Sequence, residues 1–457
     1  MKKIIKRGVA QLGLERFLGV EEIGGSNPLT PTKLVRIGLI GMGTVGTGVA
    51  KVLLEQSAEL EKKTGLRLEL KKACVRSLVK KRLVSVPKGV LTSRVQDILG
   101  DPSIDIVVEL IGGIHPAKEI LKKAFQAGKH VVTANKALLA EQGRELFAAA
   151  AATKRRLGIE ASVCGGIPVI KAIREGLVSN RVTSLLGIVN GTCNYILTAM
   201  SERGVSFDEA LKNAKESGYA EADPALDIDG VDSAHKLAVL ARLAFGSEIP
   251  FRSIAVEGIR GLAAADIAYA KELGYAIKLL AIGKKLPAGL ELRVHPTLLH
   301  LDHPLAHVRD VYNAVFLHAD QAGDLLLYGK GAGMHPTASA VVADIVDIAA
   351  SPGTDGSENG VFSGSLPVLP IGSTFTKYYL RFQVADKPGV LGAIAESLGS
   401  SGISILSVHQ KEAHSTGSVP VIILTYEAEE KALREALKII DANRMVREKT
   451  IVIRVEN

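Results

Sequence analysis

The 457-residue sequence contains no tryptophan, and its aromatic residues together make up only 4% of the chain. No aromatic platform for stacking nucleic-acid bases therefore stands out. The net charge of +8 is modest for this length, and no basic-aromatic module accompanies it, so we expect no nucleic-acid partner. A positive excess of this size would also suit an anionic cofactor or substrate.

Cysteine and long apolar runs are scarce too. Cys74, Cys164 and Cys193 form no Cys-x-x-Cys pair, which indicates a reducing compartment rather than a disulfide framework. No uninterrupted apolar run is long enough to span a bilayer, and the basic start lacks the compact apolar core of a secretory signal. We therefore expect a cytoplasmic protein with no membrane partner.

A glycine-rich turn is the first informative motif. The apolar run 34–40 is typical of a buried strand, and an apolar helical pattern follows the turn. In this context the glycine spacing predicts a dinucleotide site, because it allows a tight turn, approach of a pyrophosphate and close helix packing. The helix start then offers free amides to the phosphates. The residues of this predicted site are Gly41, Met42, Gly43, Thr44, Val45 and Gly46.

The end of the next predicted strand, residues 68–75, bears on the choice of cofactor. An acidic residue there would bind the ribose of NAD. The sequence has none at this place and continues instead with Arg76 and further basic residues. Because arginine accommodates a 2′-phosphate, we predict a preference for NADP(H) with Arg76 as its main contact, and NAD(H) stays an alternative.

The order of predicted elements gives the fold class. Strands alternate with helices to residue 152, which predicts a doubly wound parallel-sheet (Rossmann) nucleotide domain in an α/β protein. An α+β substrate and dimerisation domain follows, and the tail has the βαββαβ order of a ferredoxin-like domain. The predicted parts are an extension (1–33), the nucleotide domain (34–160) with a returning helix (336–350), the substrate domain (161–335), a linker (351–376) and the ferredoxin-like domain (377–457).

The acidic segment 218–236 is the densest cluster of charge. A proline disfavours a helix in its first half, whereas the second half begins an apolar helical pattern with Asp227 or Asp229 as the expected N-cap. Asp232 and Lys236 then lie four residues apart on one helix face. A solvated loop with a surface ion pair is the simpler interpretation, but the position downstream of a dinucleotide motif favours a functional site.

Taken together, these motifs resemble homoserine dehydrogenase. The tail, with Asp386-Lys-Pro-Gly-Val-Leu391, resembles an ACT domain, a regulatory amino-acid-binding module that also occurs in the monofunctional form of that enzyme. The resemblance covers about residues 34–350 in order. Its matching segments are 41–46, 132–136, 160–168, 190–192, 218–236 and 331–333.

The resemblance implies reversible NAD(P)-dependent reduction of L-aspartate 4-semialdehyde to L-homoserine. It assigns Lys236 as the proton donor, Asp232 as the residue that orients it, and Lys136 to the nicotinamide side, near both cofactor and substrate. Gly333 would line the far wall of the cofactor. The substrate-binding residues that it implies are Glu221, Asp227, Tyr219, Gly191 and Thr192.

Further ligands and partners follow from the same resemblance. It implies L-threonine as a feedback effector, near Asp386 and Gly389, and a homo-oligomer, either dimer or tetramer. It also implies a structural monovalent cation, usually sodium, held by backbone carbonyls. The candidate cation ligands are Glu160, Val163, Gly165 and Ile167.

Two alternatives remain open at this point. Aspartate-semialdehyde dehydrogenase would need a nucleophilic cysteine, for which Cys164 is the candidate, although its surrounding motif is absent and we expect passive packing. A catalytically inactive amino-acid sensor would keep only the ACT function. The intact set of Glu221, Asp232 and Lys236 argues against that second alternative.

Overall fold

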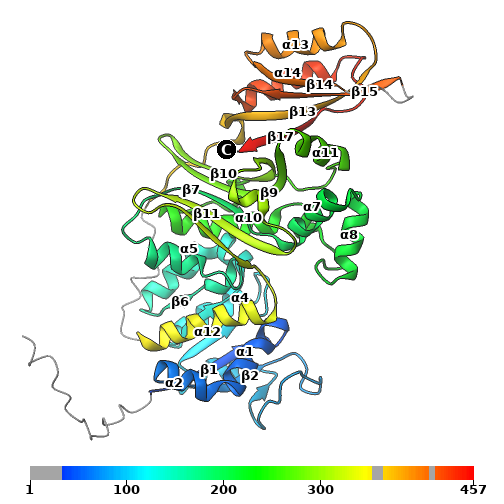
Figure 1. Cartoon of the computed structure of the whole chain (residues 1–457). Helices are drawn as coiled ribbons and strands as arrows, with labels where there is room; N and C mark the ends of the chain where they lie inside the picture. The colour runs from blue at the N-terminus through cyan, green and yellow to red at the C-terminus, as the bar shows by residue number, and fades with distance from the viewer. Residues whose placement is uncertain (1–32, 352–363, 411–416, 457) are drawn as a thin grey trace, which may run out of the picture.

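The structure, a computed structural model, describes residues 33–351, 364–410 and 417–456. Figure 1 shows three parts one above another, coloured blue to cyan, green, and orange to red along the chain. The predicted extension, apart from Lys33, lies outside the described residues. Among the helices of the described ranges, none combines the length and apolar character needed to cross a membrane.

A parallel sheet forms the first part. Its elements are β1 (Lys33–Ile40), α1 (Thr44–Glu55), α2 (Ser57–Thr64), β2 (Leu66–Cys74), β3 (Leu91–Thr92), α3 (Gln96–Leu99), β4 (Ile106–Glu109), α4 (Ala117–Gln126), β5 (His130–Thr133), α5 (Lys136–Ala152) and β6 (Leu157–Gly158). The strand order β3-β2-β1-β4-β5-β6 is that of a doubly wound nucleotide domain, as predicted. Strands β4 and β5 are buried along their whole length because both faces of the sheet are covered, whereas β2 carries charged residues at partly exposed positions.

Helix α12 (Met334–Ala350) returns to this part from the other end of the substrate domain (Figure 1). Val341 and Ile345 share one apolar core with the buried residues of β1 and β2. The contact with α1 is close, because a Cβ at Gly48 would lie 2.8 Å from the carbonyl oxygen of Met334. The first and middle parts are therefore tied together by a helix as well as by the chain crossing between them.

A long antiparallel sheet forms the middle part. Its strands β12, β11, β7, β9 and β10 are neighbours in that order, and α7, α10 and α11 contact β9. The elements are η1 (Glu160–Ser162), α6 (Val169–Lys171), η2 (Ala172–Gly176), β7 (Val182–Ile188), α7 (Gly191–Arg203), α8 (Phe207–Glu216), α9 (Ala225–Ile228), α10 (Val231–Phe245), η3 (Phe251–Ser253), β8 (Ala255–Val256), α11 (Ala264–Glu272), β9 (Tyr275–Leu286), β10 (Gly289–His300), η4 (Pro304–His307), β11 (Tyr312–Ala319) and β12 (Gly323–Lys330).

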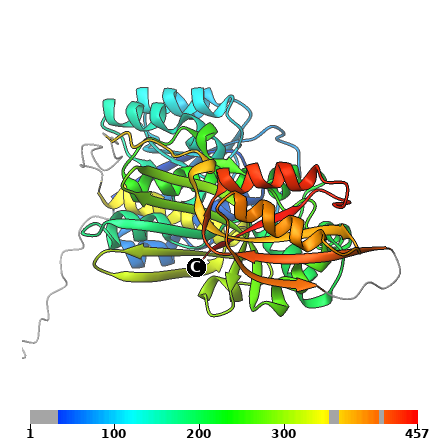
Figure 2. The same ribbon diagram turned by 90° about the horizontal axis from the view of Figure 1, so that it is seen from above.

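The third part has the predicted βαββαβ order. Its elements are η6 (Ile371–Ser373), β13 (Phe375–Ala385), α13 (Val390–Ser400), β14 (Ile405–Gln410), β15 (Ser418–Thr425), β16 (Ala428–Glu429), α14 (Glu430–Asp441) and β17 (Ile451–Glu456). The strands run in the order β17-β13-β15-β14, and all neighbours are antiparallel. Helices α13 and α14 contact each other and cover one face, as the view from above shows (Figure 2).

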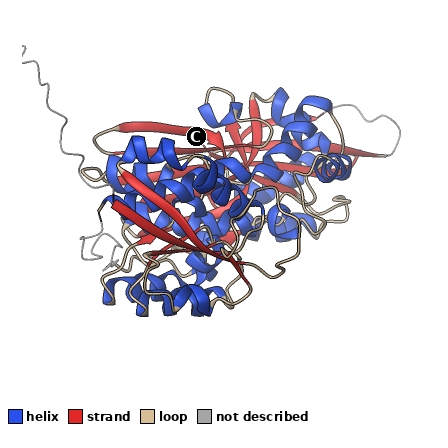
Figure 3. Cartoon of the chain, turned by 90° about the horizontal axis from the view of Figure 1, so that it is seen from below, coloured by secondary structure: helices blue, strands red, loops and turns tan. Residues whose placement is uncertain are grey.

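The strands of the middle and third parts form one continuous sheet, which the sequence did not lead us to expect. Strand β17 pairs in parallel with β10, and Arg454 lies opposite Thr297. Figure 3 shows the resulting run of strands, in red, with helices around it. The described part of the expected linker also joins this sheet, since the amide of Leu290 donates to the carbonyl oxygen of Pro367 at 2.8 Å. Backbone pairing therefore fixes the third part against the second.

Candidate functional site

The glycine turn has the geometry that a dinucleotide needs. Gly41 has a φ of +100°, which favours glycine, and a Cβ at Gly46 would lie 2.1 Å from the carbonyl oxygen of Gly41. A Cβ at Gly43 would meet nothing within 4 Å, so the backbone is open on that side. Gly43 is also the N-cap of α1 and brings no side-chain cap. The first amides of α1 are thus available to phosphate oxygens.

Beyond β2, Arg82 and Arg76 differ in their contacts. The guanidinium of Arg82 folds back on its own loop, where it donates to the carbonyl oxygens of Ser77 and Lys80 at 2.5 and 2.8 Å. Arg76 is exposed, and its side chain has no hydrogen bond or ion pair within the described ranges. Arg76 is therefore the better placed of the two arginines to meet a ligand at the end of this strand.

Lys236 and Asp232 form a buried ion pair on α10. Nζ of Lys236 donates to Oδ2 of Asp232 at 2.7 Å and to the carbonyl oxygen of Val189 at 2.6 Å. Burial favours both neutral forms, but mutual attraction outweighs it, so the pKa of Asp232 lies below its usual range and that of Lys236 above it. Lys236 therefore stays protonated at neutral pH, and in the described chain its third N–H has no protein acceptor.

Lys136 connects this pair to the nucleotide domain. It is the first residue of α5, directly after the carboxyl end of β5, and its Nζ lies 3.3 Å from Oδ1 of Asp232. The N-cap is Asn135, whose side chain accepts from the amide of Leu138. Ligands of doubly wound domains bind outside the carboxyl ends of the strands. The contact between Lys136 and Asp232 therefore brings α10 to the edge of the sheet where the glycine turn lies.

Asn190 organises the acidic residues, a role that sequence reasoning missed. Its Nδ2 donates to Oδ1 of Asp227 at 2.7 Å and to Oδ2 of Asp232 at 2.9 Å, and its Oδ1 accepts from the amide of Cys193 at 2.8 Å. The amide group is thus fixed at both ends and holds the two carboxylates in place. An asparagine directly before a helix start is a recognisable N-cap pattern that could have indicated it.

Gly191 and Thr192 form the first turn of α7, where helix geometry leaves amides without carbonyl partners. Oγ1 of Thr192 lies 2.7 Å from the carbonyl oxygen of Tyr219 and 3.2 Å from Oδ2 of Asp227. A Cβ at Gly191 would lie 2.8 Å from the carbonyl oxygen of Val311, so the backbone runs close to its neighbour. The structure thus joins these residues and Asp227 in one site with Lys236.

The start of the acidic segment is exposed, unlike the buried Asp232 and Lys236. Glu221 is exposed, and within the described ranges no contact joins it to Lys236 or Asp232. The Tyr219 side chain is 46% exposed, with its ring 4.9 Å from that of Tyr195.

The prediction of an aspartate N-cap for α10 is wrong. Gly230, with a φ of +84°, occupies that position, because it turns the chain between α9 and α10.

Two loops meet behind the site, one around Cys164 and the other around Gly331 and Gly333. The first contains Cys164 and Gly165, with φ of +56° and +44°, and a Cβ at Gly165 would lie 2.6 Å from the carbonyl oxygen of Gly331. Gly333, with a φ of +122°, is the N-cap of α12. The carbonyl of Ile167 accepts from the amide of Val169 at 2.7 Å, but a carbonyl has a second lone pair that could meet a cation.

Glu160 and Val163 belong to the first of these loops. The Glu160 carboxylate accepts from the amides of Ile170 and Lys171 at 2.9 and 2.8 Å, so the side chain caps α6. Its carbonyl oxygen lies 3.5 Å from the amide of Val163, a weak contact that leaves a lone pair for a further partner. The backbone oxygens of this loop thus fit a monovalent cation better than the Glu160 carboxylate does.

Cys164 is too deeply buried to act as a nucleophile. Its side chain is 1% exposed, and burial, which penalises the thiolate, raises its pKa to about 12. Burial also raises the pKa of Cys193, and the carboxylates of Asp227 and Asp232 raise it further. A thiol with a raised pKa is a poor nucleophile at neutral pH.

Glu109, at the end of β4, is a second residue that the sequence did not indicate. It is fully buried, and its Oε1 accepts from the amides of Ile111 and Gly112 at 2.8 and 3.0 Å. Its Oε2 accepts from Oγ1 of Thr133 at 2.7 Å. Glu109 therefore fixes the loop that follows β4 relative to the end of β5, beside the glycine turn.

The predicted effector loop lies at the start of α13. Gly389, with a φ of +86°, is its N-cap, and Asp386 is exposed. In the described chain, no side chain caps the helix start. The first amides of α13 are thus free to meet an anion, which is compatible with an amino-acid carboxylate.

A doubly wound sheet with an open glycine turn, and a protonated lysine held by an aspartate at its carboxyl edge, define the class of NAD(P)-dependent oxidoreductases. The family models agree. Residues 41–160 match the homoserine dehydrogenase NAD-binding domain, residues 168–346 match homoserine dehydrogenase, and residues 378–444 match the ACT domain. The chain belongs to the homoserine dehydrogenase family.

Relatives and solved structures lead to the same family. A homoserine dehydrogenase of Pseudomonas aeruginosa is 44% identical over 93% of this chain and 99% of its own. The crystal structure of the Thiobacillus denitrificans homoserine dehydrogenase has a TM-score of 0.87 and 44% identity, and the match covers 93% of this chain and 99% of that one. A hyperthermophilic archaeal homoserine dehydrogenase in complex with NADPH has a TM-score of 0.59 and 28% identity over 69% of this chain and 97% of that one.

Proposed function

We propose that this chain reduces L-aspartate 4-semialdehyde to L-homoserine reversibly, with Lys236 as the proton donor. The observation that carries this proposal is the contact of Lys136 with Asp232, which brings the buried Lys236 pair to the cofactor edge of the nucleotide sheet. When bound, the nicotinamide supplies a hydride to the aldehyde carbon. Lys236 gives the proton to the developing alkoxide and stabilises its negative charge. In the reverse direction the unprotonated amine accepts that proton.

The substrate termini would be bound by the start of α7 and the acidic segment. The amides of Gly191 and Thr192 suit the carboxylate, because helix N-termini favour anions. Asp227, held by Asn190, and Glu221 suit the ammonium group, with Tyr219 beside them. Since Glu221 is exposed without the substrate, its role requires residues 218–223 to fold onto the bound ligand.

For the cofactor, we propose a preference for NADP(H). The glycine turn and the amides of α1 bind the pyrophosphate, Arg76 meets the 2′-phosphate, and Gly333 lines the opposite wall. The archaeal neighbour in complex with NADPH supports this choice, although the likeness there is 28% identity. A sodium ion on the carbonyls of Glu160, Val163, Gly165 and Ile167 would be structural.

For regulation and assembly, we propose L-threonine as a feedback inhibitor, bound near Asp386 and Gly389, in a cytoplasmic homo-oligomer. The open amide start of α13 supports a carboxylate ligand there. Threonine that leaves both activity and oligomeric state unchanged would contradict this part.

Steady-state oxidation of homoserine with NAD⁺ and with NADP⁺, each with and without threonine, tests the proposal. We expect homoserine-dependent reduction of NADP⁺, faster than that of NAD⁺ at equal concentration. Phosphate-dependent oxidation of NADPH by the semialdehyde, lost in Cys164→Ser, would instead indicate aspartate-semialdehyde dehydrogenase. Threonine binding without any turnover would indicate an inactive sensor.

A further inference from the structure

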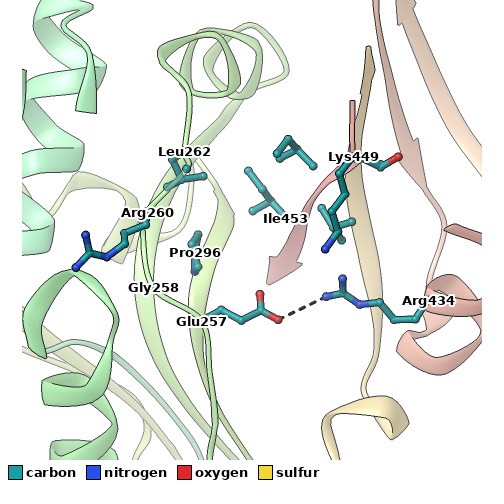
Figure 4. A pocket seen from close by; sticks show the side chains of 12 residues that line it. Glu257, Gly258, Arg260, Leu262, Pro296, Arg434, Lys449 and Ile453 are labelled. Atoms are coloured by element: carbon teal, nitrogen blue, oxygen red, sulfur yellow. Dashed lines mark hydrogen bonds and ion pairs between the residues drawn. The ribbon is translucent and has the colours of Figure 1, made fainter. Parts of the chain in front are cut away.

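A cavity of about 460 Å³ lies at the seam between the middle part and the ACT domain. Figure 4 shows its two walls. Glu257 and Leu262 come from the middle part, and Arg434, Lys449 and Ile453 come from the ACT domain. The cavity therefore belongs to neither domain alone, and it is distinct from both the Lys236 site and the start of α13.

A buried arginine joins the two walls of this cavity from behind. Arg454 is 1% exposed, and its guanidinium donates to both oxygens of Glu257 at 2.9 Å. The same guanidinium donates to both oxygens of Glu430 at 2.7 and 2.9 Å. Together with the pairing of β10 and β17, these contacts fix the two walls relative to each other.

The charge that remains free in the cavity is positive. Glu257 faces it, but Arg454 and Arg434 together balance the charges of Glu257 and Glu430, which leaves the ammonium of Lys449 in excess. Arg434 binds Glu430 at 2.7 Å and lies 3.5 Å from Glu257, whereas Lys449 has no hydrogen bond or ion pair in the described chain. Pro296, Leu262 and Ile453 make the remaining wall apolar. This combination suits a small carboxylate with an apolar body.

One segment links the cavity to the active site. Residues 257–262, here called the strap, line the cavity on one side and pack on Ile228 and Asp229 on the other. The amide of Ile259 donates to the carbonyl oxygen of Ile228 at 2.8 Å, and Arg260 turns away from the cavity to pair with Asp229. A Cβ at Gly258 would lie 2.1 Å from the carbonyl oxygen of Ile228, so the strap packs too closely on Ile228 to leave room for a side chain at this position.

Ile228 and Asp229 stand between the two aspartates that Asn190 holds, Asp227 and Asp232. We propose that the seam cavity binds a small carboxylate with an apolar body, and that its occupancy acts through the strap on these aspartates. The carboxylate lies between Lys449 and Arg434, and its apolar body lies on Ile453 and Leu262. The second half of this inference rests on the proposed function, whereas the binding itself does not.

Calorimetry on the full chain tests the binding, with 4-methylpentanoate and L-leucine as probes, which differ only by the amino group. Because Glu257 is already paired with the two arginines, we expect 4-methylpentanoate to bind at least as tightly as leucine, with a dissociation constant on the order of 0.1–1 mM. Lys449→Glu should weaken binding at least tenfold. The matched control is Arg444→Glu, an exposed residue of the same loop that does not line the cavity and should bind like the wild type.

Three results would overturn the binding half. They are no heat from either probe at millimolar concentration, binding of leucine alone, or unchanged affinity in Lys449→Glu. To test the coupling of the cavity to the active site, we measure the KM for homoserine. We expect the probe to change it at least twofold in wild type and not in Lys449→Glu. A probe that binds with no kinetic effect overturns the coupling alone. A chain that shows no homoserine oxidation contradicts the proposed function, and calorimetry still decides whether the cavity binds.

Discussion

The molecule contains two charge clusters, each built around a buried cation, that use the same chemistry differently. The active-site cluster consists of Lys236, Asp232 and Lys136, and the seam cluster consists of Arg454, Glu257 and Glu430. In the seam cluster each carboxylate oxygen accepts from one guanidinium. In the active-site cluster, one N–H of Lys236 has no acceptor in the described chain.

This difference separates a structural cluster from the cluster that we propose to be catalytic. A buried charge is costly unless its hydrogen bonds are satisfied, so the complete seam cluster fixes geometry. The active-site cluster leaves one donor for a group that is not part of the protein. Arginine suits the first role because its guanidinium never loses its proton, whereas lysine can release one.

Removal of the proton donor should give the largest effect. We expect Lys236→Ala to lower kcat for homoserine oxidation roughly 10²–10⁴-fold, the usual contribution of positioned acid–base catalysis. Steady-state kinetics measure it, and circular dichroism checks the fold. The control is Lys271→Ala, an exposed lysine at the end of α11. Wild-type turnover in Lys236→Ala would refute the assignment.

Breaking the seam cluster should affect stability rather than chemistry. Arg454→Met takes a guanidinium away from Glu257 and from the buried Glu430, which keep Arg434 as a cationic partner, and we expect the free energy of unfolding to fall by about 1.5–3 kcal/mol. Urea unfolding measures it. Adding Glu257→Gln and Glu430→Gln to this variant should recover most of the loss, because no uncompensated buried charge remains. Equal stability of the single and triple variants would show that charge is not the cause.

The pH profile should respond to Asp232. Burial lowers the pKa of Lys236, and Asp232 more than reverses this. In Asp232→Asn that attraction is lost, so the pKa of Lys236 falls. Oxidation needs the unprotonated amine, and its rise with pH should therefore move toward lower pH. An unmoved profile in kcat/KM would mean that another group accepts the proton.

The smallest expected effect is on cofactor choice. Arg76→Ala removes a charge-assisted contact, and we expect the KM for NADP⁺ to rise about tenfold, which corresponds to 1.4 kcal/mol. The KM for NAD⁺ should change less than twofold. Arg82→Ala is the matched control, because that side chain is bound to its own loop. An equal rise for both cofactors would exclude recognition of the 2′-phosphate.

Elements with strong local patterns could be predicted from the sequence. The predicted alternation of strands and helices ends at residue 152, where α5 ends in the structure, because an apolar strand, an asparagine cap and a helical run define β5 and α5 locally. The pair of Asp232 and Lys236 was predicted for the same reason, since four residues on a helix fix their distance.

Contacts between distant segments could not be predicted in this way. Asn190 and Asp232 lie 42 residues apart, and nothing in either segment specifies their hydrogen bond. The pairing of β17 with β10 could not be predicted for a similar reason. Arg454 and Glu456 look like exposed charges of an edge strand, and only the pairing of β17 with β10 buries them.

The pairing of β10 with β17 has a consequence for the order in which the protein is made. Residues 301–450 separate the two strands, so at about 5–20 residues per second the ribosome needs roughly 8–30 s after β10 to produce β17. During that time β8 pairs with part of this edge of β10, but residues 297–299 have no partner strand there, and unpaired edges invite association with other chains. The nascent chain thus passes through a period in which its catalytic half is made but its sheet is incomplete.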